Sequence, residues 1–101
     1  MTVNVQTKNL TLTDALSGHV AKRFSFVGRL VKRFDSLGAV SMNIELARIT
    51  RHHRKGDVFY AEVNLHLGGR LIRSEESAED LYTAINATRN TLKRELSRFH
   101  S

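Results

Sequence analysis

Two segments of alternating apolar and polar residues constrain the fold of this chain more than any other feature. The segments are 40–46 and 59–67, and a period of two is the pattern of a β-strand with one buried face. A sheet built from such strands must be covered on one side, while its other side meets solvent. The apolar positions are Val40, Met42, Ile44 and Leu46 in the first segment and Phe59, Ala61, Val63, Leu65 and Leu67 in the second.

The second segment runs directly into Gly68-Gly69, which predicts a β-hairpin. Both glycines accept a positive φ at little cost, as a two-residue hairpin turn requires. Pairing across this turn puts Leu67 opposite Arg70 and Leu65 opposite Ile72, which keeps the apolar side chains together. We therefore expect another strand directly after the turn.

Apolar residues recur at helical spacing in two further regions. The first follows Thr13, which has the side chain of an N-cap, and Asp14 suits the first turn of a helix. The second follows Ser77, which with Asp80 resembles a capping box. The positions predicted to face the core are Leu16, Val20, Phe24, Val27, Val31 and Phe34 in the first helix and Leu81, Ile85, Leu92, Leu96 and Phe99 in the second.

Together with a short strand predicted at residues 2–7, these elements follow the order β-α-β-β-β-α. Strands with one apolar face need cover on one side only, so we expect a four-stranded sheet with two helices packed on one face. The chain has 101 residues, no proline and no low-complexity linker. It is therefore predicted to form a single α+β domain spanning residues 1–101.

The charge balance indicates an acidic partner. Sixteen Lys and Arg residues against 10 Asp and Glu give a net charge of +6, which favours nucleic acid, an anionic membrane surface or an acidic protein. The absence of cysteine excludes disulfides, thiolate catalysis and cysteine metal sites. No signal peptide is apparent, and no apolar run approaches the roughly 20 residues of a membrane helix. We expect a cytoplasmic protein with no membrane partner.

Both predicted helices carry basic stripes. At about 100° per residue, Lys22, Arg29 and Arg33 align along the first helix, and Arg94 and Arg98 form one flank of the second. Neighbouring basic helices on one side of a sheet favour a phosphate-binding surface. Such a surface positions RNA without reading its sequence. The candidate nucleic-acid-binding residues are Lys22, Arg23, Arg29, Arg33, Arg89, Lys93, Arg94 and Arg98.

Arg94 and Arg98 also have a purely structural explanation. Basic residues near a helix C-terminus stabilise the helix by roughly 0.3–1 kcal/mol each through its dipole, and no ligand is needed. The same explanation does not account for Lys22 or Arg23, which precede the last turn of the first helix. Both interpretations of Arg94 and Arg98 remain open at this point.

Several motifs follow one another in an order that is specific as a combination. The Gly-Gly turn leads into LIRSEESAEDLYTAIN and then LKRELSRF, while LTDAL begins the first helix and RFD ends it. In this combination the chain resembles the ribosome hibernation factor family, also called ribosome-associated translation inhibitors. The matching positions in the last helix region are Asp80, Leu81, Tyr82, Ala84, Ile85, Asn86, Leu92, Arg94, Leu96 and Arg98.

The resemblance implies a fold similar to the double-stranded RNA-binding domain. It also implies binding to the small ribosomal subunit in the channel between head and body, where overlap with the messenger and transfer RNA sites blocks translation in stationary or stressed cells. Arg23, Arg94 and Arg98 match positions at which the family's basic residues face ribosomal RNA. Thr91 and Phe26 stand where Lys is common. Other basic residues of the first helix are expected to compensate, because a phosphate surface tolerates shifted charge.

The family has long and short forms, and this chain resembles the short form because its last helix ends near Ser101. The expected partners are the small ribosomal subunit and its rRNA. We expect no cofactor, no metal and no small-molecule substrate, and a monomer when the protein is off the ribosome.

Three other interpretations remain open. A generic module for double-stranded RNA would share the fold but lack ribosome specificity. An enzyme would need a catalytic site, yet the only histidine cluster, His52-His53 in the polar loop 51–57, has no acidic cluster at ligand spacing, so we expect no catalysis. A protein-interaction module would use Phe26 and Leu30, which extend the apolar face of the first helix sideways.

Overall fold

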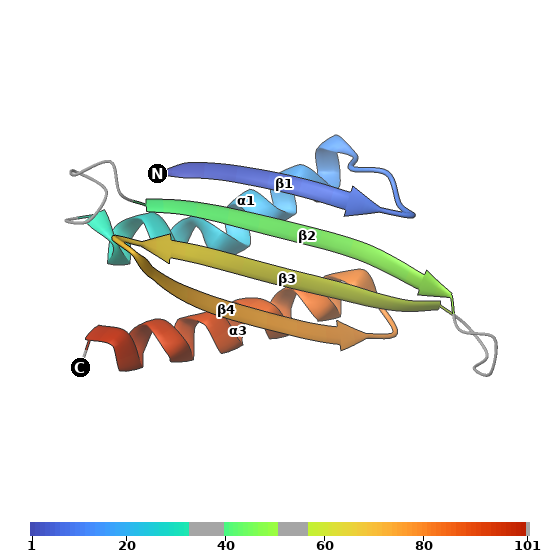
Figure 1. Ribbon diagram of the computed structural model, residues 1–101. Coiled ribbons are helices and arrows are strands. Elements are labelled where there is room, and N and C mark those ends of the chain that lie inside the picture. The colour runs from blue at the N-terminus through green and yellow to red at the C-terminus, as the bar shows by residue number, and fades with distance from the viewer. Residues whose placement is uncertain (33–39, 51–56, 101) are drawn as a thin grey trace.

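The part of the chain that the structure describes forms one four-stranded sheet and two long helices. The computed structural model describes residues 1–32, 40–50 and 57–100. The strands lie in the order β1-β2-β3-β4, with β1 parallel to β2 and the other neighbours antiparallel (Figure 1). The predicted β-α-β-β-β-α order is confirmed. The elements are β1 (Thr2–Lys8), α1 (Asp14–Leu30), β2 (Val40–Thr50), β3 (Asp57–Leu67), β4 (Arg70–Ala78) and α3 (Leu81–His100).

The β3–β4 hairpin has the predicted turn and register. Gly68 and Gly69 have φ angles of 50° and 90°, in the region that suits glycine best. Leu67 pairs with Arg70 and Leu65 with Ile72, as the alternation predicts. The register therefore keeps the apolar side chains of both strands on the same face.

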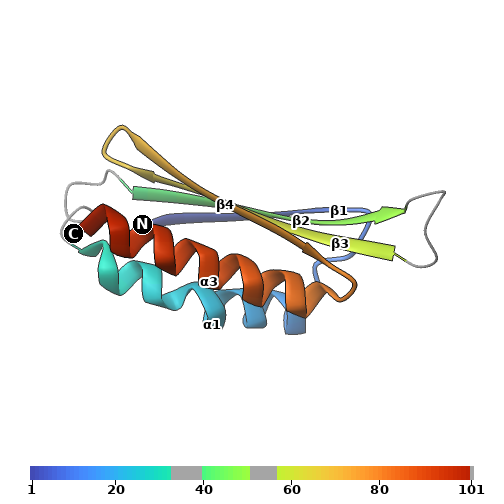
Figure 2. The same ribbon diagram turned by 90° about the horizontal axis from the view of Figure 1, so that it is seen from below.

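Both helices cover that apolar face, and among the described residues no helix lies over the opposite face of the sheet (Figure 2). The alternating residues of β2 and β3 are buried under the helices, apart from Phe59, which is half-buried at the end of β3. The prediction of two helices on one face is confirmed. Neither described helix combines the length and apolarity needed to cross a membrane. The core side chains outside the strands are Leu16, Val20, Phe24, Phe26, Val27, Val31, Ala84, Ile85, Leu92 and Leu96. Phe34 and the side chain of Phe99, also predicted to face the core, lie outside what the structure describes.

α1 begins as predicted. The Thr13 hydroxyl accepts a hydrogen bond from the Leu16 backbone N–H at 3.1 Å, which satisfies one of the free donors of the first turn. Asp14 occupies that first turn, where the helix dipole favours a negative charge. The helix ends at Leu30, with Val31 as its C-cap.

The start of α3 corrects the prediction of a capping box at Ser77. Ser77 is still in β4, paired with Tyr60 of β3, because the hairpin ladder continues to Ala78. Asp80 provides the cap instead, and its carboxylate accepts hydrogen bonds from the backbone N–H and the hydroxyl of Thr83 at 2.9 and 3.0 Å.

A buried threonine in the middle of α3 ties the helix to the sheet. The Thr88 hydroxyl lies 2.8 Å from the Ala84 carbonyl of its own helix and 3.2 Å from the Ala61 carbonyl of β3. The Thr88 carbonyl accepts a bond from the Ser74 hydroxyl of β4 at 2.9 Å. Thr88 is fully buried, so these bonds replace the water that its hydroxyl has lost. They set the position of α3 against β3 and β4.

Thr88→Val should destabilise the fold. Valine has nearly the same shape but cannot donate a hydrogen bond, so we expect a loss of about 1 kcal/mol and a melting temperature lower by roughly 4–8 °C. Thermal unfolding followed by circular dichroism measures this. Thr11→Val, at an exposed position, is the matched control and should melt like the wild type. Equal melting temperatures for both variants would contradict the proposed role of the Thr88 hydroxyl.

Candidate nucleic-acid interface

Five of the eight predicted binding residues are exposed on the two helices. They are Lys22 and Arg29 of α1 and Lys93, Arg94 and Arg98 of α3. Because both helices lie on the same face of the sheet, their exposed residues share one layer of the molecule (Figure 2). We call the exposed surface of α1 and α3 the helical layer. A sixth predicted residue, Arg33, lies outside the described residues.

The remaining two predicted residues, Arg23 and Arg89, lie between the helices. Arg23 Nε donates a hydrogen bond to Asn86 Oδ1 at 2.7 Å. The guanidinium carbon of Arg89 lies 5.0 Å from the centroid of the Phe26 ring, which is a cation–π contact. Both arginines are half-buried. Their charges are therefore held in place by side chains of the opposite helix.

A third contact joins the two helices. The rings of His19 and Tyr82 meet edge to face, with centroids 4.6 Å apart. Arg23 and Asn86 are 63 positions apart, and the other two pairs have the same separation. A constant separation means that α1 and α3 run parallel and in register. We call these three pairs, His19–Tyr82, Arg23–Asn86 and Phe26–Arg89, the inter-helix seam.

The inter-helix seam determines how exposed Phe26 and Leu30 are, the two apolar residues that suggested a protein-interaction module. Phe26 is only 6% exposed, because Arg89 and the core cover it. Leu30 remains 41% exposed beyond the last pair of the seam. Tyr82 is 42% exposed while its ring contacts His19, so it lines the helical layer without being part of the core.

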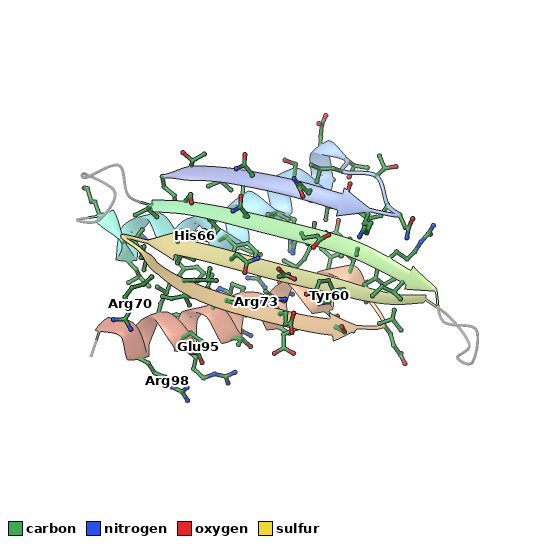
Figure 3. All side chains as sticks on the ribbon, in the orientation of Figure 1. Tyr60, His66, Arg70, Arg73, Glu95 and Arg98 are labelled. Atoms are coloured by element: carbon green, nitrogen blue, oxygen red, sulfur yellow. The ribbon has the colours of Figure 1, made fainter. Side chains whose placement is uncertain are left out.

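The other flank of α3 faces β4. Thr91 donates a hydrogen bond to Glu76 of β4 at 3.0 Å, and Arg94 donates to the Thr91 hydroxyl at 3.4 Å. Arg98 forms an ion pair with Glu95 at 3.2 Å, and both side chains project from the edge of α3 away from α1 (Figure 3). Both Arg94 and Arg98 lie in the last two turns of α3, so their contribution to the helix dipole and a role in binding are compatible.

Sequence reasoning missed a further cation beside this flank. Arg70, just after the hairpin turn, lines a shallow hollow between β4 and the C-terminal half of α3 together with Arg73, Glu95 and Arg98. The hairpin register places Arg70 at the start of β4, but only the packing of α3 on β4 brings it near Arg98 (Figure 3).

The open face of the sheet has the opposite electrostatic character. Glu45, Glu62 and Glu75 are direct cross-strand neighbours on β2, β3 and β4. The Tyr60 hydroxyl donates to Glu62 and lies 2.6 Å from Glu75 Oε2. One cation, Arg73, contacts Glu62 at 3.2 Å and Glu75 at 3.0 Å. The predicted hairpin register already implied that Glu62 and Glu75 pair, whereas the pairing of Glu45 with Glu62 depends on the β2–β3 register, which was not predicted.

These contacts shift the acid–base properties of the cluster. The hydrogen bond from Tyr60 is the main reason that the pKa of Glu62 lies below its usual value, with Asn64 and Arg73 helping. The pKa of Glu75 is lowered by Tyr60 and then by Arg73. Burial, together with the hydrogen bonds to both carboxylates, raises the pKa of Tyr60. The carboxylates therefore stay ionised at neutral pH, and the open face carries negative charge.

Tyr60→Phe should reduce stability at neutral pH by about 0.5–1 kcal/mol, because a hydrogen bond to a partly exposed carboxylate is lost. A carboxyl group with a lowered folded-state pKa stabilises the fold above its ordinary pKa, here 4.5, and this stabilisation disappears as the pH falls through the folded-state pKa. The difference between variant and wild type should therefore shrink below pH 4.5. Urea unfolding from pH 3 to 7 measures it. Tyr82→Phe is the matched control, and a pH-independent difference for Tyr60→Phe would contradict this account.

Metal binding finds no support in the part of the chain that the structure describes, where no group of three or more His, Asp or Glu side chains is arranged to hold a metal ion. The His52-His53 pair, the one candidate from the sequence, lies outside the described residues.

The fold and this surface define a class of small α+β proteins in which two parallel helices carry exposed cations on one side of a mixed sheet. A sequence model of the family described as Sigma 54 modulation protein / S30EA ribosomal protein matches residues 3–101. The chain belongs to this family. The resemblance to ribosome hibernation factors is thus confirmed.

Individual relatives agree with this assignment. The chain is 29% identical over 96 residues to a ribosome hibernation promotion factor of Bacillus subtilis, covering 95% of this chain and 47% of the relative. It is 26% identical over 98 residues to a ribosome hibernation promoting factor of Klebsiella oxytoca, covering 97% and 92%. The chain thus spans about half of the first relative and nearly all of the second. The expectation of a short form stays a prediction.

Solved structures show the same fold. The crystal structure of the Thermus thermophilus Protein Y N-terminal domain superimposes with a TM-score of 0.72 and 25% identity, covering 98% of this chain and 99% of that domain. A ribosomal subunit interface protein from Coxiella burnetii gives the same TM-score at 16% identity, covering 99% and 98%. The predicted fold class is confirmed.

Proposed function

We propose that this chain is a ribosome hibernation factor that binds the small ribosomal subunit through the cations of α1 and α3. Bound there, it occludes the messenger and transfer RNA sites and inhibits translation under stress or in stationary phase. Its role is binding without catalysis, its site of action is the cytoplasm, and it is a monomer when free. The names of the relatives from Bacillus subtilis and Klebsiella oxytoca support the ribosomal partner.

One observation carries the RNA-binding part of this proposal: the two faces of the molecule have different charges. The helical layer presents Lys22, Arg29, Lys93 and Arg94 to solvent. The open sheet face presents a cross-strand row of three glutamates with one arginine. A polyanion is attracted to the first face and repelled by the second. RNA phosphates therefore have one favoured side of approach.

Binding to small subunits should depend strongly on salt. If about six phosphates are neutralised, the logarithm of the association constant should fall against the logarithm of salt concentration with a slope near −5. Co-sedimentation with purified small subunits at several salt concentrations measures the slope. A flat response would contradict binding through the basic surface. Equally tight binding to a free RNA duplex, without association with small subunits, would instead favour a generic double-stranded RNA-binding module.

Replacing Arg94 and Arg98 with Ala should weaken binding about tenfold or more and make the salt slope less steep by about 2, because two phosphate contacts are lost. The fold should lose only the small helix-end contribution of roughly 0.3–1 kcal/mol per residue. Co-sedimentation and thermal unfolding of the same variant separate the two effects.

The matched control is Lys8→Ala, which removes one positive charge from β1, at the edge of the sheet opposite β4. It should leave both the affinity for small subunits and the salt slope unchanged. If the Arg94 and Arg98 variant loses stability but no affinity, these arginines serve only as helix-end charges.

A further inference from the structure

The inter-helix seam divides the cations of the helical layer into two kinds. Lys22, Arg29 and Lys93 are exposed side chains, whose long stems sample many rotamers until a ligand holds them. Arg23 and Arg89 are half-buried and contact the opposite helix. The seam therefore holds two guanidinium groups at fixed places between the exposed cations of α1 and α3.

Arg23 is held in a way that leaves most of its donors available. Its Nε–H is used by Asn86 Oδ1 at 2.7 Å, while its two Nη groups have no hydrogen-bond partner among the described residues. Those Nη groups are part of the planar fork with which arginine binds phosphate. Asn86 itself carries no charge, so its contact orients the guanidinium without neutralising it.

Arg89 is also held in place with some of its donors left available, but by a cation–π contact in place of the hydrogen bond that holds Arg23. The Phe26 ring supports its guanidinium plane from the core side, and Nη1 donates to Asn90 at 3.0 Å. Phe26 cannot turn freely because it is almost fully buried, so the position of the ring is set by the core. The remaining Nε and Nη2 donors of Arg89 have no partner in the described part of the chain.

We propose that Asn86 and Phe26 are positioning residues for RNA binding, which orient the guanidinium groups of Arg23 and Arg89 toward backbone phosphates before RNA arrives. A side chain that is already ordered loses less conformational entropy on binding, so each contact contributes more to affinity. This inference rests on the proposed RNA-binding function and adds that two uncharged residues control its strength. The ligand chemistry is that of adjacent phosphates of an RNA strand.

A double-mutant cycle on Arg23 and Asn86 tests the proposal. Asn86→Ala should weaken binding to small subunits about three- to tenfold while leaving the salt slope unchanged, because no phosphate contact has been removed. Arg23→Ala should weaken binding and make the slope less steep by about 1. In the Arg23→Ala background, Asn86→Ala should have no further effect, since it acts only through Arg23. Asn43→Ala, on the open sheet face, is the matched control and should bind like the wild type.

A second pair of variants tests Phe26. Phe26→Tyr keeps the ring face and should preserve affinity, whereas Phe26→Leu keeps an apolar side chain without the ring and should weaken binding with an unchanged salt slope. If Phe26→Leu unfolds at the assay temperature, Arg89→Lys tests the same contact without changing the core. It keeps the charge but replaces the planar guanidinium that lies over the Phe26 ring, and should lower affinity several-fold.

Each outcome is decisive when small subunits and a free RNA duplex are both used as probes. Wild-type protein that binds neither probe overturns both the proposed function and this inference. Wild-type protein that binds only the duplex overturns the ribosomal function, and the cycle on the duplex then decides the inference. An Asn86→Ala variant that binds normally, or that loses the same affinity with and without Arg23, overturns the inference alone.

Discussion

Every other feature of this structure depends on the one-sided apolar face of its sheet. The strands β2 and β3 alternate so regularly that only one face of the sheet needs cover. Both helices bury their apolar stripes, and this face of the sheet accepts both. As a result α1 and α3 lie side by side, and basic residues far apart in the sequence come to share one layer (Figure 2). The opposite face carries the cross-strand neighbours Glu45, Glu62 and Glu75.

The same constraint separates charge. Residues that alternate with the core positions of β3 and β4 include Tyr60, Glu62 and Glu75, and these must point to the open face because their neighbours point to the helices. The exposed basic residues Lys22, Arg29 and Lys93 lie on the helices, on the other side of the sheet. A chain with a modest net charge of +6 therefore carries a much stronger local contrast between its two sides. In the proposed function, this contrast favours one orientation of the protein relative to the RNA.

The seam shows how a departure from the family pattern is accommodated. Phe26 occupies a position where the resemblance leads us to expect Lys. The positive charge that a Lys would carry there is supplied by Arg89 of the other helix, whose guanidinium lies over the Phe26 ring. A phosphate-binding surface depends on the positions of its charges more than on which residue carries each one. The aromatic ring also gives this charge a fixed location, which a lysine on a flexible stem would lack.

The sequence alone determined the type and order of the elements, the hairpin register and the one-sided packing, because these follow from periodicities and turn residues that act over a few neighbouring positions. It extended the first helix to the RFD segment at residues 33–35, whereas α1 ends at Leu30. It also identified which helical residues are basic and, through the hairpin register, implied the pairing of Glu62 with Glu75. It misplaced the α3 cap, because continued pairing of β4 with β3 keeps Ser77 in the strand and leaves Asp80 to cap the helix.

Only the tertiary structure decided which basic side chains are exposed to solvent and which are held by contacts with the opposite helix. A helical wheel describes the faces of one helix, but the seam depends on how α1 is placed against α3, across 63 positions of sequence. That placement is set by the packing of both helices on the sheet, which is a property of the whole core and of no local segment.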